Sequence, residues 1–137
     1  MFRFCLLACA LLASHSFKAL RFGPCPILEH PVDPPTFEGA LYERSIYFDT
    51  YTPFLPNHLD CTTVEWPIAN SSDLILGTDN ASYVVTYRCN FFPKFYSHEE
   101  IVRTFTVESN PENSTIEAIE DAFMKNNINP KAARILC

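Results

Sequence analysis

The sequence contains little glycine, no excess of positive charge and few long apolar stretches. Only 3 of its 137 residues are glycine, beside 11 prolines. This scarcity excludes a glycine-rich nucleotide loop, a collagen repeat and a flexible linker. The formal net charge of −6 has the wrong sign for nucleic acid and disfavours an anionic membrane surface.

The composition instead suits one folded domain. Hydrophobic residues make up 47% of the chain and charged residues 19%, which argues against disorder. A length of 137 residues is typical of a single domain. Aromatic residues make up 14% of the chain, a composition typical of strands and apolar pockets.

Residues 1–16 have the pattern of a secretory signal peptide. Arg3 precedes an apolar run over residues 4–13, and the small-x-small pattern of Ser14 and Ser16 follows. The run is too short for a membrane anchor. We expect cleavage after Ser16, with Ala19 as the second choice, and a secreted domain over residues 17–137 without stable membrane insertion.

Cysteine usage fits secretion. Cys5 and Cys9 leave with the signal peptide, and the remaining four cysteines favour two disulfides in one of three connectivities. A zinc site would need close pairs such as C-x-x-C, so no metal is expected. The four cysteines are Cys25, Cys61, Cys89 and Cys137.

Three N-x-S/T sequons also fit a secreted protein, and none is blocked by proline. Each lies in a polar, turn-like stretch, and we expect at least one to carry a glycan. Their asparagines are Asn70, Asn80 and Asn113.

The spacing of apolar, β-forming and turn residues predicts five strands. The clearest pair is a hairpin, because residues 79–82 combine Asx and small residues between two apolar runs. Residues 20–38 contain five prolines and should run extended. The five predicted strands are 41–48, 61–66, 74–78, 83–89 and 101–107, with loops at 49–59 and 90–98.

A helix is expected near the C-terminus. Ser114 and Glu117 form a capping-box pattern, and Ile116, Ile119 and Phe123 follow at helical spacing. Asn126-Asn127 should end the helix. Its single apolar stripe indicates that it packs on the sheet.

Catalytic signatures are missing. His30, His58 and His98 are isolated from one another, and the motifs of serine hydrolases and zinc proteases do not occur. Glu99-Glu100 is interpreted as a solvated surface. The sequence therefore predicts no catalytic residue and no cofactor, and it favours an apolar pocket or a binding surface over an enzyme.

Three stretches resemble the lipocalins, and within them the apolipoprotein D group and its invertebrate relatives. Residues 23–26 (GPCP) and 37–43 (FEGALYE) are similar to the family's G-x-C-P opening and G-x-W-Y-E first-strand motif. Residues 73–89 resemble its sixth and seventh strands, with the T-D turn and the Y-x-x-x-Y-x-C ending. Residues 116–137 resemble the closing helix and the terminal cysteine.

The resemblance implies a disulfide pairing and a fold. The pairing would be Cys25 with Cys89 and Cys61 with Cys137. The fold would be mainly β: an antiparallel up-and-down β-barrel with one C-terminal α-helix. The chain departs from the family in two ways. First, both members of a tryptophan–arginine pair are missing: Leu41 replaces the first-strand tryptophan, and the arginine after the last strand has no clear equivalent at residues 107–111. Second, strands three to five, about 40 residues, are missing, so an incomplete barrel of about five strands is expected.

Two functional hypotheses follow. The first, implied by the resemblance, is that the protein binds or transports a small hydrophobic molecule of the lipid, fatty acid, sterol or retinoid class. The inner wall of the binding cavity would include alternate residues of the family's sixth strand, Leu74, Leu76 and Thr78. Tyr47 or Trp66 would lie near the mouth of the cavity. The second is a secreted interaction protein without a cavity. It would contact a protein partner through loops 49–59 and 90–98, which contain Phe54, Phe91, Phe92 and Phe95.

Overall fold

The structure is a computed structural model that describes residues 21–48 and 61–137. The predicted signal peptide, residues 1–16, and the predicted loop 49–59 lie outside the described residues. Within the described part of the chain, no helix combines the length and apolar content needed to cross a membrane.

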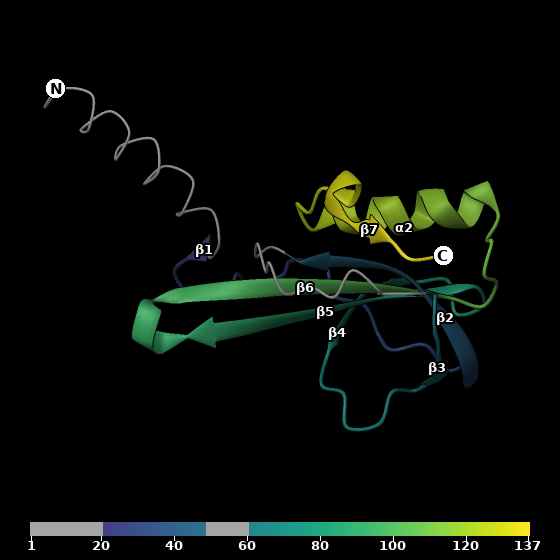
Figure 1. Cartoon of the computed structure of the whole chain (residues 1–137), viewed down its shortest axis with the longest axis horizontal. Coiled ribbons are helices and arrows are strands. Elements are labelled where there is room, and N and C mark those ends of the chain that lie inside the picture. The colour runs from purple at the N-terminus through teal and green to yellow at the C-terminus, as the bar shows by residue number, and fades with distance from the viewer. Residues whose placement is uncertain (1–20, 49–60) are drawn as a thin grey trace, which may run out of the picture.

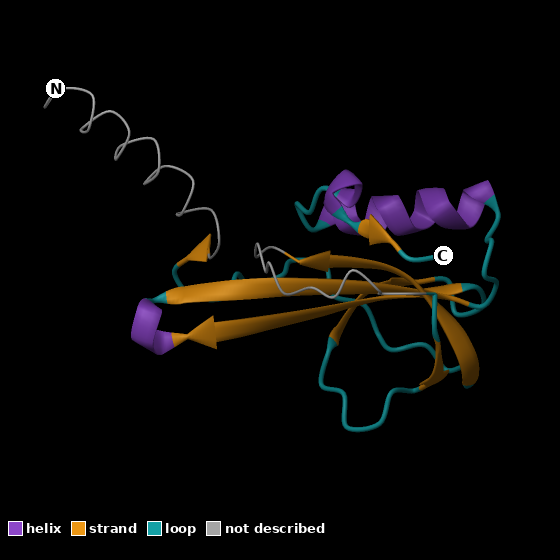
Figure 2. Cartoon of the chain, in the orientation of Figure 1, coloured by secondary structure: helices purple, strands orange, loops and turns teal. Residues whose placement is uncertain are grey.

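The core of the fold is an antiparallel sheet with one helix on one of its faces (Figures 1 and 2). The strand order is β3-β2-β6-β5-β4, with β1 paired to β6 and β7 paired to β2. The strands are β1 (Arg21–Phe22), β2 (Gly39–Phe48), β3 (Thr63–Trp66), β4 (Leu74–Thr78), β5 (Tyr83–Phe92), β6 (Ser97–Thr106) and β7 (Arg134–Ile135); the helix is α2 (Asn113–Lys125), with short 3-10 turns η1 (Pro93–Phe95) and η2 (Pro130–Ala132).

The five predicted strands are confirmed as β2 to β6. The short strands β1 and β7 were not predicted, because two residues are too few to show a periodic pattern. The predicted loop 90–98 is wrong. The β5–β6 register runs without a break from Tyr83↔Thr106 to Phe92↔Ser97. The β-forming residues Phe91 and Phe92 lengthen β5, and β6 begins at Ser97 in register with them, after the η1 turn.

The helix is confirmed, but its predicted capping box is wrong. The carbonyl of Glu112 accepts the first helical bonds, from the backbone N–H of Thr115 (3.0 Å) and of Ile116 (3.1 Å). The N-cap is therefore Glu112, with no side-chain cap, and Ser114 lies inside the first turn. The predicted end is confirmed, with Asn126 at the C-cap and Asn127 at φ +57°.

Each face of the sheet has its own hydrophobic cluster. Ile119 and Phe123 of α2 pack on one face, whereas Trp66 and Phe105 pack on the other with their ring centroids 6.2 Å apart. The helix-side cluster is Tyr47, Leu76, Tyr83, Val85, Tyr87, Val102, Ile119, Ala122, Phe123 and Ile128; the opposite cluster is Leu41, Trp66, Ile75, Val84 and Phe105.

Within the described residues, the sheet does not close into a barrel. β3 and β4 are consecutive along the chain, yet they form the two opposite edges of the sheet. Residues 67–73 connect these edges along the chain. In Figure 1 this connection lies on the side of the sheet away from α2.

The structure contains both disulfides that the resemblance implies. Cys25 is bonded to Cys89, and Cys61 is bonded to Cys137. The linked residues are 64 and 76 positions apart, and on the chain-entropy model each bond stabilises the fold by up to about 4 kcal/mol. The first bond ties the N-terminal segment to β5, and the second ties Cys137 to Cys61, two residues before β3.

Candidate functional site: a pocket between β4 and α2

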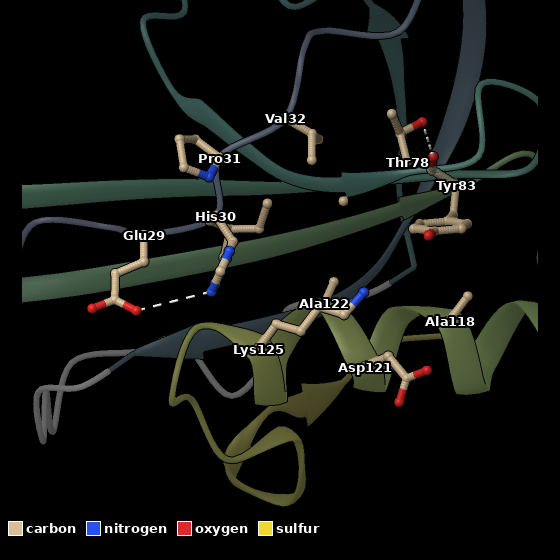
Figure 3. Close-up of a pocket in the computed structure, with 12 residues that line it drawn as sticks. Glu29, His30, Pro31, Val32, Thr78, Tyr83, Ala118, Asp121, Ala122 and Lys125 are labelled. Carbon is tan, nitrogen blue, oxygen red and sulfur yellow. Dashed lines mark hydrogen bonds and ion pairs between the residues drawn. The ribbon is translucent and has the colours of Figure 1, made fainter.

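An open pocket of about 620 Å³ lies on the helix side of the sheet. Figure 3 shows its three sides: β4 with the start of β5, one flank of α2, and the extended segment 29–32. This volume is within the usual range for small-molecule sites. Twelve residues line it: Glu29, His30, Pro31, Val32, Leu76, Gly77, Thr78, Tyr83, Ala118, Asp121, Ala122 and Lys125.

Small residues on β4 and α2 let the two elements approach closely. A Cβ atom added at Gly77 would lie 2.7 Å from the Cβ of Ala122, closer than two carbon atoms can pack. Ala118 lies one helical turn before Ala122 on the same flank. Larger side chains at 118 and 122 would fill the space, so the small residues of α2 determine that a pocket exists here.

The segment 25–36 forms the outer wall and is held at three points. Its start is bonded through the Cys25–Cys89 disulfide. In its middle, the N–H of Val32 donates to the carbonyl of Ile75 at 2.8 Å. Near its end, the N–H of Thr36 donates to Oδ1 of Asn80 at 2.7 Å. These anchors lay an extended, proline-rich segment along the outer edge of β4.

Tyr83 supplies the principal polar group beside the apolar floor. Its side chain is buried, and burial, with the negative charges of Asp79 and Asp121, raises its pKa above 10.0. The phenol therefore keeps its proton at neutral pH and can donate a hydrogen bond. Thr78 is positioned beside it, because its hydroxyl donates to the carbonyl of Tyr83 at 2.7 Å.

The turn between β4 and β5 is organised by Asp79. Its Oδ1 accepts from the backbone N–H groups of Ala81 (3.0 Å), Ser82 (2.7 Å) and Tyr83 (3.3 Å), and its Oδ2 accepts from the Ser82 hydroxyl. Burial opposes ionisation of Asp79, but these hydrogen bonds outweigh it and lower its pKa. A stable carboxylate thus fixes the direction in which Tyr83 enters the pocket.

The rim of the pocket is charged. Asp121 and Lys125 lie one helical turn apart on α2, and Glu29 and His30 face them across the opening (Figure 3). His30 Nε2 lies 3.9 Å from Glu29 Oε2. An apolar floor beneath a charged rim suits a molecule with an apolar body and a polar end.

The five predicted ligand-binding residues do not come together. Leu76 and Thr78 line the pocket, whereas Leu74 is 48% exposed and lies outside it. Tyr47 is buried in the helix-side cluster and Trp66 in the opposite cluster. The assumption of one parity is wrong: Leu74 pairs with Tyr87, but a bulge between Ile75 and Gly77 places Thr78 opposite Val84, on the other face.

Several pocket residues were missed at the sequence level. Ala118, Ala122 and Asp121 were assigned only to a helix packing on a sheet, and Tyr83 only to a strand. Two signals could have revealed them. Gly77 interrupts an apolar strand, which indicates close approach of another element, and the two alanines recur at helical spacing to leave room.

The sheet face opposite α2 carries ion pairs beside the apolar cluster of Trp66 and Phe105. Arg103 donates to Glu43 through Nε (2.8 Å) and Nη2 (3.0 Å). This hydrogen-bonded pairing raises the pKa of Arg103. On the same face, Arg88 Nε donates to Asp73 at 2.7 Å. Charged side chains thus lie next to the apolar cluster on the face away from α2.

Structural comparison identifies similar folds, although no family profile and no curated protein sequence matches the chain. Insecticyanin from the tobacco hornworm Manduca sexta is similar at a TM-score of 0.69 with 15% identity, covering 88% of this chain and 89% of that one. Lobster apocrustacyanin A1 gives 0.56 with 13% identity, covering 86% and 90%. H1 crustacyanin from the lobster Homarus americanus gives 0.57 with 13% identity, covering 86% and 90%. These proteins are lipocalins, and the chain has their fold with an unclosed sheet.

Proposed function

We propose that the protein is a secreted, incomplete lipocalin that binds a small hydrophobic molecule in the pocket between β4 and α2. The pocket carries the proposal: it combines a volume of about 620 Å³ with an apolar floor and a buried phenol. The lipocalin fold supports a binding protein rather than an enzyme. The resemblance to the apolipoprotein D group rests on the sequence motifs alone.

The lining favours a ligand with an apolar body and one polar end, such as a fatty acid, a sterol or a retinoid. Leu76, Val32 and the two alanines offer apolar contact. The neutral phenol of Tyr83 can donate to a carboxylate or a hydroxyl. Lys125 at the rim adds a positive charge that suits a carboxylate.

Native mass spectrometry of the secreted protein with a panel of fatty acids, sterols and retinoids tests the proposal. One ligand bound per chain is the expected result. In Ala118→Phe, a phenyl ring enters the pocket from α2, so the bound fraction should fall by about tenfold or more.

The matched control is Glu120→Phe, which places the same ring on an exposed position of α2 outside the pocket. It should bind like the parent protein. If the parent binds no member of the panel, ligand binding is refuted. If Ala118→Phe binds as well as the control, ligand binding stands but its assignment to this pocket is wrong.

Secretion is supported by the two disulfides and by three exposed sequons. Asn70 and Asn80 have φ values of +58° and +64° in turns, and Asn113 begins α2. At Asn80 the hydrogen bond from Thr36 engages Oδ1, and Nδ2 stays available for a glycan. Enzymatic removal of N-glycans should lower the mass of the secreted protein, and each Asn→Gln change at an occupied site should lower it by one glycan; an unchanged mass would contradict glycosylation.

The second hypothesis, a partner-binding protein without a cavity, is less well supported. One of its two loops, 49–59, lies outside the described residues, and residues 90–98 are strand ends joined by a short turn. A pocket of ligand size is also present. The exposed aromatic residues that motivated this hypothesis do gather at that turn, where they support a different inference.

A further inference from the structure

Four aromatic side chains cluster at the tip of the β5–β6 hairpin and remain exposed to solvent. Phe22 is 82% exposed and Phe95 66%, while Tyr96 and Phe91 are 51% and 40% exposed. The ring centroids of Phe22 and Tyr96 lie 5.0 Å apart, and those of Phe91 and Tyr96 lie 6.2 Å apart, both edge to face. We call these four residues the aromatic tip. So much exposed aromatic surface in one place marks an interaction site.

The backbone holds the aromatic tip in place. Tyr96 has φ +45°, which is unusual for a bulky residue. Its N–H donates to the carbonyl of Pro93 at 3.2 Å, and its own carbonyl accepts from the N–H of Gly23 at 2.7 Å. The pairing of β1 with β6 brings Phe22 to the same place. Two chain segments far apart in sequence thus build one surface.

The tip projects from the molecule. In Figure 1 the turn between β5 and β6 is at the left end of the sheet, beyond the end of α2, and β1 lies beside it. Exposed rings at the end of the sheet can meet a flat surface. Tyr rings settle at the interface between lipid and water, and Phe rings enter the boundary between headgroups and acyl chains.

The tip carries an exposed lysine. Lys94 is exposed, its Nζ 5.9 Å from the ring centroid of Phe95, and none of the ion pairs recorded among the described residues involves it. Of the two nearby carboxylates, Glu100 lies 3.6 Å from Arg21 and accepts from Tyr87 at 2.9 Å, and Glu99 accepts from the amide of Asn90 at 2.8 Å. A lysine beside exposed rings complements a headgroup phosphate, but a net charge of −6 repels an anionic bilayer.

We propose that the aromatic tip docks the protein reversibly on a zwitterionic phosphatidylcholine surface. The rings enter the headgroup region and Lys94 contacts the phosphates. The remainder of the chain stays in water. This is superficial docking, without a membrane-spanning segment.

Flotation of the full-length secreted protein with phosphatidylcholine vesicles tests the proposal. The parent should float, and the double variant Phe22→Ser/Phe95→Ser should lose about tenfold in bound fraction, because two exposed rings no longer enter the interface. Both positions are exposed, so the fold should persist, as circular dichroism would verify. In Phe95→Trp the indole emission should shift to shorter wavelength when vesicles are added.

The control is Met124→Ser/Ile135→Ser, which removes two exposed apolar side chains, 55% and 58% exposed, from α2 and β7. It should float like the parent. Vesicles that contain phosphatidylserine should bind less protein than neutral ones, because of the negative net charge.

Three outcomes overturn the proposal. The first is a parent protein that does not float. The second is equal flotation of the tip variant and the control, and the third is stronger binding to anionic than to neutral vesicles. If sedimentation shows that Phe22→Ser/Phe95→Ser abolishes self-association while flotation is unchanged, the tip is a contact between copies of the chain.

Discussion

Gly77 allows β4 and α2 to touch, so the change Gly77→Ala tests the geometry of the pocket directly. The new Cβ would meet the Cβ of Ala122 at 2.7 Å, and the helix must move outward. Overpacking of this kind costs about 1–3 kcal/mol. Alanine also lowers the conformational entropy of the unfolded chain relative to glycine, and this offsets about 0.4–1 kcal/mol of the cost. A net loss of about 1–2 kcal/mol is expected, which lowers Tm by about 4–8 °C.

Urea unfolding with the disulfides intact measures this loss, and a double-mutant cycle identifies its cause. In Gly77→Ala/Ala122→Gly the two Cβ atoms no longer collide, so the double variant should be more stable than the sum of the single changes by about 1–2 kcal/mol. The control cycle uses Ala118→Gly, since the nearest atoms that the new Cβ meets belong to Ala122 and Tyr83. That pair should be additive within about 0.5 kcal/mol. A neutral or stabilising Gly77→Ala, or equal coupling in both cycles, would refute the close approach.

Three further predictions concern the groups around the pocket. The pKa of Tyr83 in the folded protein lies above 10.0. Its contribution to stability is therefore complete below pH 10.0 and is lost as the pH rises through the folded value. In a series of urea midpoints at increasing pH, Tyr83→Phe should reduce this loss of stability at alkaline pH. The folded pKa of Asp79 lies below 3.8, so its contribution is complete above pH 3.8 and is lost as the pH falls through the folded value; Asp79→Asn should remove that acid dependence, and an unchanged profile would contradict it. The double change Cys25→Ser/Cys89→Ser frees the outer wall and should cost up to about 4 kcal/mol by calorimetry, with weaker ligand binding; unaltered binding would show that the wall does not contribute to the site.

The strands were predictable because their alternation and turn chemistry are local properties. The hairpin of β4 and β5 follows from apolar runs on either side of an Asx turn, and the structure adds the bonds to Asp79 that make the turn. The helix could be predicted from Ile119 and Phe123, which are buried as their spacing indicates. The start of the helix could not be predicted in this way. Its first hydrogen bonds go to the backbone carbonyl of Glu112, and every residue type has such a carbonyl.

The site was predictable only in part, because it depends on which segments meet. Leu76 and Thr78 were expected to contact a ligand, and both line the pocket. They were expected inside a barrel, however, with Leu74 on the same face. A one-residue bulge separates the faces of Leu74 and Thr78, and no residue pattern in a five-residue strand announces it. The proline-rich wall is likewise set by three distant anchors.

The connection over residues 67–73 gives the fold an unusual freedom to change in length. It joins β3 to β4, the two edges of the sheet, along the chain, and neither disulfide bonds to a residue within it. The entropy of closing a loop rises only slowly with its length, so additional hairpins inserted here would leave every existing strand pair intact. The segment between β3 and β4 can therefore be exchanged while the rest of the sheet is kept. Grafting strands at this point is a direct route from the open sheet to a closed container.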